Sequence, residues 1–297
     1  MFALIGLGLL WSWFNPARMD STTIRKVLTD TVYFIFLPAL VMKVLWQADL
    51  SLDSAKIALI AAVCVISSLL LSLFICRRCK TNKQVTGAIV LAAAFPNATY
   101  LGYPVLINTL GPWAGAVAIQ FDLFACTPLL LTLGVLLAAH HGTTGEKPHP
   151  LLLLLKVPPL WAALIATSLN LLGIKPVGQL IDLFAIMGSA VVPIMLFVIG
   201  LALQQGFKEI RHIKTVIPVI GIQLFIMPVI ALGCAWLLHL PVDLRHAVVL
   251  EAAMPSMALG VVLCDRYGLN TGIYAAAVTA TTLLSLFTLP LWHGWLS

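Results

Sequence analysis

Two polar segments interrupt hydrophobic stretches of this chain, and they hold the residues best suited to chemistry. The first begins at Pro96 and continues with Asn97, Thr99, Tyr100, Gly102, Tyr103 and Pro104. The second, 159 residues later, runs from Met254 through Pro255 to Ser256. Proline removes a backbone donor and clashes with the carbonyl four residues earlier, so a helix should unwind at both places. In hydrocarbon, such backbone is tolerated only where it is buried in protein or lines a cavity.

The unwound backbone predicts an anion site. A half-helix beginning near Asn97 would present free amides and the positive end of its dipole to the protein interior. The second interruption, around Pro255 and Ser256, would do the same from the opposite direction. An organic carboxylate suits such a field. The alternative is that Pro96 and Pro255 only kink ordinary helices.

Two carboxylates fall inside hydrophobic stretches, and such residues usually mark ion paths, proton relays or paired charges. Glu251 lies four residues before Pro255. It is expected to bind a coupling cation with backbone carbonyls and hydroxyls, or to carry a proton; a structural hydrogen bond is the alternative. Asp122 is the second candidate, and Met254 and Thr127 complete the set expected at the coupling ion.

The composition places both interruptions in a membrane protein. The 297-residue chain is 61% hydrophobic and 9% charged, whereas soluble domains carry about 25% charged residues. Apolar runs separated by polar or basic breaks predict an all-α fold of ten transmembrane helices, at residues 1–14, 27–46, 55–75, 85–109, 113–138, 151–172, 181–203, 213–238, 245–265 and 271–292.

Ten spans divide into two sets of five, and an odd number in each set makes the second set run inverted to the first. Leu37-Pro38-Ala39 recurs as Val192-Pro193-Ile194 at an offset of 155 residues, close to the 159 of the two interruptions. We therefore expect a single transporter domain over residues 1–297, with one repeat at 1–139, a cytoplasmic loop at 140–150 and the second repeat at 151–297.

Charge placement predicts the orientation. Of the 17 lysines and arginines, 13 lie near loops that follow odd-numbered spans. Because cytoplasmic loops carry an excess of Lys and Arg, these loops are expected in the cytoplasm and both termini outside. The net charge of +6 then needs no nucleic acid to explain it.

The span count, the orientation, Leu37-Pro38-Ala39 and the run from Pro96 to Pro104 make the chain resemble the bacterial auxin efflux carrier family. That family includes malate and malonate permeases and is related to the plant PIN auxin transporters. The resemblance implies that the fourth and ninth spans are broken crossover helices. It also implies a scaffold domain and a transport domain that move by an elevator-type mechanism.

Under this resemblance, Asn97 corresponds to the crossover asparagine that meets the substrate carboxylate. The other residues of the interruptions are expected to open the helices, bind substrate or line the cavity: Pro96, Thr99, Tyr100, Tyr103, Pro255 and Ser256. The fold is also similar to the bile acid:sodium symporters, where a glutamate near the second crossover binds sodium. Glu251 stands in that place, but Pro255-Ser256 replaces their glutamine-asparagine pair, so coupling to sodium, to protons or to no ion stays open.

The sequence thus predicts a secondary transporter of a small organic anion, such as malate, malonate or an auxin-like acid, in the bacterial inner membrane. The alternatives are a voltage-driven uniporter and an intramembrane enzyme that pairs Asp122 with Glu251, although no protease or nucleophile motif occurs. No cofactor beyond Na⁺ or H⁺ is expected, because the Cys76-x-x-Cys79 pair lacks the further ligands that zinc needs. The expected partners are the carboxylate and the bilayer, with a homodimer left open.

Overall fold

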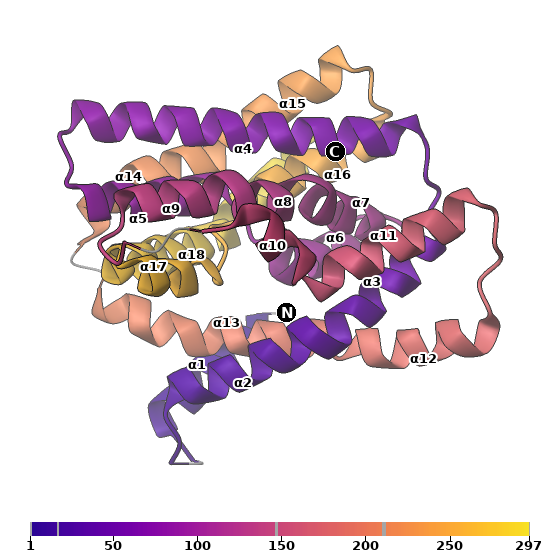
Figure 1. Ribbon diagram of the computed structural model, residues 1–297, viewed down its shortest axis with the longest axis horizontal. Helices are drawn as coiled ribbons and strands as arrows, with labels where there is room; N and C mark the ends of the chain where they lie inside the picture. Colours follow the sequence, from indigo (N-terminus) through magenta and orange to yellow (C-terminus); the bar gives the residue numbers. More distant parts are fainter. Residues whose placement is uncertain (1, 17, 146–147, 210–211, 297) are drawn as a thin grey trace.

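The structure is a computed structural model that describes residues 2–16, 18–145, 148–209 and 212–296. Lys147 and Arg211, which contribute to the predicted charge asymmetry, lie outside these ranges. The described chain is helical and contains no named strand (Figure 1). The predicted all-α class is therefore confirmed.

The helices of the first half are α1 (Phe2–Phe14), α2 (Ser21–Thr31), α3 (Leu37–Trp46), α4 (Leu52–Arg78), α5 (Lys83–Ala94), α6 (Tyr103–Thr109), α7 (Ala114–Phe121), α8 (Thr127–Leu129) and α9 (Val135–His141). The helices of the second half are α10 (Pro150–Leu155), α11 (Pro158–Leu171), α12 (Gly178–Ser189), α13 (Val191–Lys208), α14 (Ile213–Gly221), α15 (Met227–Leu237), α16 (Val242–Ala252), α17 (Gly260–Tyr267) and α18 (Thr271–Leu296).

Six continuous helical stretches in the described residues are long and apolar enough to cross a membrane: Ser21–Trp46, Leu52–Arg78, Ala114–His141, Gly178–Gln204, Ile213–Leu237 and Thr271–Leu296. A multi-pass membrane protein follows. The predicted spans 85–109 and 245–265 are each broken into two helices, as their prolines indicate. Neither half alone reaches the ~30 Å of a hydrocarbon core at ~1.5 Å per residue. The full set of ten spans and the inverted repeat stay predictions.

Wide π-helical turns precede four of the helices that carry proline at their second position. These turns are η1 (Val32–Phe36), η2 (Ala98–Gly102), η3 (Asp122–Cys126) and η6 (Ile222–Ile226), and the prolines are Pro38, Pro104, Pro128 and Pro228. The residue before each proline donates to a carbonyl five residues back, as Leu37 N–H does to Val32. A π-helical turn contains one residue more than an α-helical turn. The backbone hydrogen bonds therefore continue up to the residue before the proline, which itself has no N–H to donate. A fifth such turn is η4 (Leu130–Gly134).

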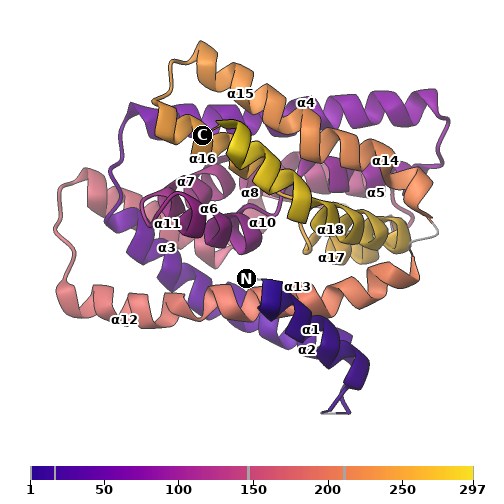
Figure 2. The same ribbon diagram turned by 180° about the vertical axis from the view of Figure 1, so that it is seen from behind.

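The helices form two groups by their packing contacts. In the first group, α1 packs on α13, and α3 packs on α11 and α12. One hydrophobic cluster lies around α3, α11 and part of α13, whereas Ile5 of α1 and Leu196 and Ile199 of α13 join the larger cluster of the second group. Glycines allow the closest approach, because a Cβ atom on Gly8 or Gly200 would overlap the facing backbone. The second group holds α4, α5, α7, α9 and α14 to α18. Figures 1 and 2 show α12 and α13 along one edge of the molecule, and α4 and α15 along the opposite edge.

Candidate functional site

The two proline-broken segments meet in the protein interior. The amide of Asn97 donates to the carbonyl of Pro255 over 2.7 Å, and the amide of Met257 donates to the carbonyl of Phe95 over 3.0 Å. These bonds form an antiparallel bridge between Pro96 and Ser256. The bridge residues are buried, so each broken segment supplies backbone partners that the other lacks.

Ser256 provides the hydrogen-bond donor that Pro96 removes from the end of α5. In a continuous helix, the carbonyl of Ala92 would accept from the residue at position 96, but proline has no N–H to give. The hydroxyl of Ser256 donates to this carbonyl over 2.7 Å instead. The amide of Ser256 donates in turn to the hydroxyl of Thr281 on α18 over 3.1 Å. Ser256 therefore joins α5, the second break and α18.

The first break leaves donors free. After Asn97 the chain re-enters the helix formed by η2 and α6, and the Asn97 carbonyl accepts from the amides of Leu101 and Gly102. Within the described chain, the amides of Ala98 and Thr99 and the side-chain amide of Asn97 donate no hydrogen bond. Asn97 and Thr99 are both 4% exposed. Free amides at a helix start favour a negatively charged group.

Glu251 lies fully buried near the end of α16, and neither of its carboxylate oxygens has a hydrogen-bond partner in the described chain. It sits against Gly102 of the first break, where an added Cβ atom would overlap the carboxylate. Gly102 is therefore required to make room for Glu251. An isolated buried carboxylate is costly unless a cation or a proton neutralises it.

Asp122, by contrast, has a donor on each oxygen. Thr99 donates to one carboxylate oxygen, and Thr127 donates to the other over 2.8 Å. Asp122 begins the wide turn η3 and is partly buried. Because Thr99 belongs to the first break, Asp122 fastens that break to the helical stretch 114–141.

Two buried glutamines also have side-chain oxygens without a described partner. Gln223 in η6 is fully buried, and its amide donates to the carbonyl of Met254 over 2.9 Å while its oxygen has no partner in the described chain. The oxygen of Gln120 on α7 is likewise buried without a described partner. Gln223 is not among the predicted site residues. A polar side chain within an apolar stretch beside Pro228 was the only signal for it.

The structure brings most of the predicted residues together at this crossing. They are Pro96, Asn97, Thr99, Tyr100, Met254, Pro255 and Ser256, all buried, with Glu251 against Gly102 and Thr127 on Asp122. Tyr103 lies one turn further on and packs against Gly115 of α7. This placement does not establish what any of them binds, so their roles stay predictions. No group of three His, Cys, Asp or Glu side chains suited to a metal occurs in the part of the chain that the structure describes.

A cavity of about 240 Å³ opens beside the crossing, between α1, α6, α16 and α18. Leu101 and Leu250, the neighbours of Gly102 and Glu251, form part of its wall. Ile5 on α1 faces them from the first helix group. The space therefore lies where the two helix groups adjoin.

The chain is similar to known membrane transporters. The profile of a family described as membrane transport protein matches residues 2–293. An uncharacterized transporter of Methanothermobacter thermautotrophicus is 31% identical over 92% of this chain and 88% of its own length. The uncharacterized transporter YfdV of Escherichia coli is 24% identical over 80% of this chain and 77% of its own. The uncharacterized sodium-dependent transporter YocS of Bacillus subtilis is 36% identical, over 33% of this chain and 31% of its own.

Proposed function

The chain belongs to the family of membrane transport proteins, and from that premise we propose that it is a secondary transporter of a small organic carboxylate. The match agrees with the resemblance to auxin efflux carriers drawn from the sequence. The observation that carries the proposal is the crossing of two buried, proline-broken segments. The break at Asn97 has donors without described partners, and Glu251 and Gln223 near the second break have acceptor oxygens without described partners.

The donor side supports a carboxylate substrate. No lysine or arginine occurs in residues 84–109 or 246–260. A carboxylate would therefore be held by the amides after Asn97, by the Asn97 side chain and by the dipole of the following half-helix. One such group satisfies these donors. A second carboxylate would need a cationic partner, so a monocarboxylate is favoured over a dicarboxylate.

The acceptor side supports coupling to a cation. Glu251, Gln223 and Gln120 offer oxygens without a described partner, and oxygen ligands suit Na⁺ or a proton rather than an anion. The Met254 carbonyl, which accepts from the Gln223 amide, is a further oxygen at the second break. The partial match to a transporter named as sodium-dependent points the same way. Asp122 and Thr127 are the weaker candidates, since the Asp122 oxygens already accept hydroxyls.

The two helix groups support alternating access by relative movement. The buried apolar side chains form two clusters, a smaller one around α3 and α11 and a larger one that holds Phe95, Ala98 and Met254 of the crossing. We therefore propose an elevator-type motion, with the inverted repeats at residues 1–139 and 151–297 as its framework. An intramembrane enzyme is disfavoured, because Asp122 shares no hydrogen bond with Glu251.

Purified protein in proteoliposomes tests the proposal. Uptake of labelled malate, malonate, pyruvate and indole acetate should reveal one saturable substrate. Asn97→Ala should weaken its binding by about tenfold or more, the loss expected for a hydrogen bond to a charged group. Asn82→Ala is the control for loss of an asparagine side chain away from the crossing, since Asn82 is exposed and caps the start of α5.

Failure to bind or move any of these acids would refute the carboxylate proposal. Unchanged affinity in Asn97→Ala would remove Asn97 from the site. Uptake driven by membrane potential alone, without a sodium or proton gradient, would favour the uncoupled uniporter.

A further inference from the structure

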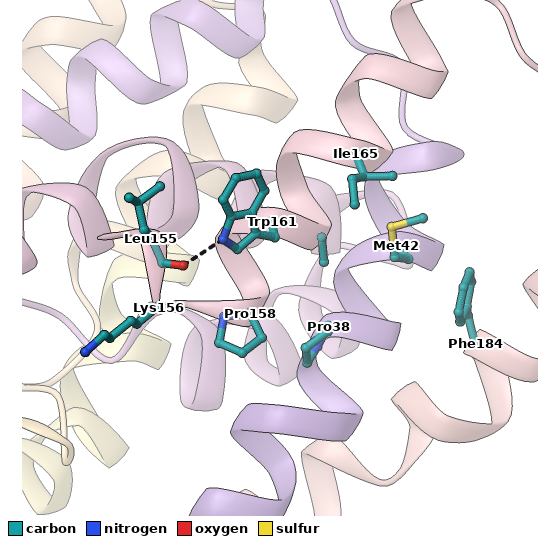
Figure 3. A pocket seen from close by; sticks show the side chains of 9 residues that line it. Pro38, Met42, Leu155, Lys156, Pro158, Trp161, Ile165 and Phe184 are labelled. Carbon is teal, nitrogen blue, oxygen red and sulfur yellow. Dashed lines mark hydrogen bonds between the residues drawn. The ribbon is translucent and has the colours of Figure 1, made fainter. Parts of the chain in front are cut away.

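A second hollow lies on the outside of the first helix group, away from the crossing. It is a groove of about 490 Å³ between α3, α11, α12 and the turn that precedes α11 (Figure 3). Its lining is apolar except at one end: Pro38, Met42, Leu155, Pro158, Trp161, Ala162, Ile165 and Phe184 line it, together with Lys156. Lys156 is the single charged residue among them and is exposed.

The groove follows from how α3 and α11 are joined. At one end, the side-chain amide of Asn170 donates to the carbonyls of Leu45, Trp46 and Ala48, which ties the ends of the two helices together. At the other end, α11 begins with Pro158 and Pro159. The groove lies at this second end, where no such tie is present in the described chain.

The turn before α11 also sets the position of an indole ring. α10 ends at Leu155 and the chain turns before α11, so the Leu155 carbonyl has no helical donor in the described part of the chain. The indole N–H of Trp161 donates to this carbonyl over 2.8 Å, which holds the ring at the groove, and the Lys156 side chain extends outward at the same end (Figure 3). Tryptophan and lysine are the side chains that anchor proteins at the head-group level of a bilayer.

We propose that this groove binds one anionic phospholipid, with an acyl chain between α3, α11 and α12 and the phosphate at Lys156. The apolar lining matches the chain, and the single cation matches the head group. The predicted orientation places Lys156 at the cytoplasmic leaflet, whose surface is negative.

Native mass spectrometry of the full chain with phosphatidylglycerol and phosphatidylcholine tests the site. Wild-type protein should retain one phosphatidylglycerol more firmly than phosphatidylcholine. Lys156→Gln should weaken that retention about fivefold, the loss expected for one lysine at an anionic surface. Lys175→Gln, an exposed lysine in the loop after α11, is the matched control and should behave as wild type.

A second variant separates the acyl-chain site from charge alone. Ala162→Leu fills the groove without altering charge and should also reduce retention, with unfolding in phosphatidylcholine micelles as the check on folding. Equal retention of both lipids, or equal losses in Lys156→Gln and Lys175→Gln, would overturn the proposal. So would cross-linking of two copies through Ile165→Cys in a Cys79→Ser background, since the face would then be covered by a second chain.

Discussion

Asp122 and Glu251 are both acidic residues inside apolar helical stretches, but only Asp122 has donors on its oxygens. The hydroxyls of Thr99 and Thr127 replace the water that the Asp122 carboxylate loses on burial. A structural role, holding the first break in place, therefore accounts for Asp122. Glu251 has no such replacement and is fully buried. A buried charge without compensation is costly, so we expect a proton or a cation to neutralise Glu251.

Glu251→Gln should therefore separate coupling from folding. If a cation or a proton neutralises Glu251, the variant should lose the sodium or pH dependence of uptake, and in a sodium-coupled carrier the apparent sodium affinity should fall about tenfold or more. In a proton-coupled carrier, wild-type uptake should decline as the external pH rises, and the variant should not follow. Uptake at varied sodium and pH in proteoliposomes measures both.

Thermal unfolding distinguishes this role from a structural hydrogen bond. In sodium-free buffer, Glu251→Gln should be at least as stable as wild type, because glutamine has the same shape as glutamate and lacks its uncompensated charge. Asp53→Asn, at a partly exposed carboxylate paired with Lys56, controls for loss of a negative charge elsewhere. A variant that keeps full ion dependence, or that unfolds well below wild type without sodium, would contradict the assignment.

At the level of elements, each broken segment completes the other. Pro96 leaves the Ala92 carbonyl without its helical donor, and Ser256 of the second break provides one. The backbone bonds of Asn97 and Met257 close the same junction. These bonds join the two broken helices at one junction. The junction also fixes the position of the free donors that follow Asn97.

Ser256→Ala should destabilise this junction by about 1–3 kcal/mol, because the buried Ala92 carbonyl loses its hydroxyl partner. Denaturation in detergent measures the change. Ser285→Ala is the matched control: Ser285 also donates to a backbone carbonyl, that of Thr282, but within the continuous helix α18. Equal losses in the two variants would show that the Ser256 bond has no special weight at the break.

Local sequence signals predict the breaks but not the partners across them. Pro96 and Pro255 mark the interruptions because proline acts within its own helix. The role of Gly102 depends on its contact with Glu251, which is over a hundred residues away in the sequence. The role of Gln223 depends on its bond to Met254, over thirty residues away. No local sequence pattern encodes either contact. The wide turns before Pro38 and Pro128 escape prediction for a related reason, since a continuous kinked helix has the same apolar pattern.

For the whole molecule, one orientation in the bilayer must fit both the charge asymmetry of the loops and the proposed movement of the helix groups. The 13 basic residues on one side predict that the loop after α4 faces the cytoplasm. The elevator proposal adds that the second helix group moves across the bilayer while the loops keep their sides. A label on a loop should therefore report orientation independently of transport state.

The native cysteines allow this orientation to be measured. Cys79, just after α4, is exposed, whereas Cys64, Cys76, Cys126 and Cys264 are buried and Cys234 is partly exposed within α15. A membrane-impermeant maleimide should therefore leave Cys79 unmodified in intact cells and label it after permeabilisation. In a Cys79→Ser background, Asp49→Cys, in the exposed turn between α3 and α4, should be labelled in intact cells. Reversal of both patterns would place both termini in the cytoplasm, and labelling of both positions from one side would rule out a crossing by α4.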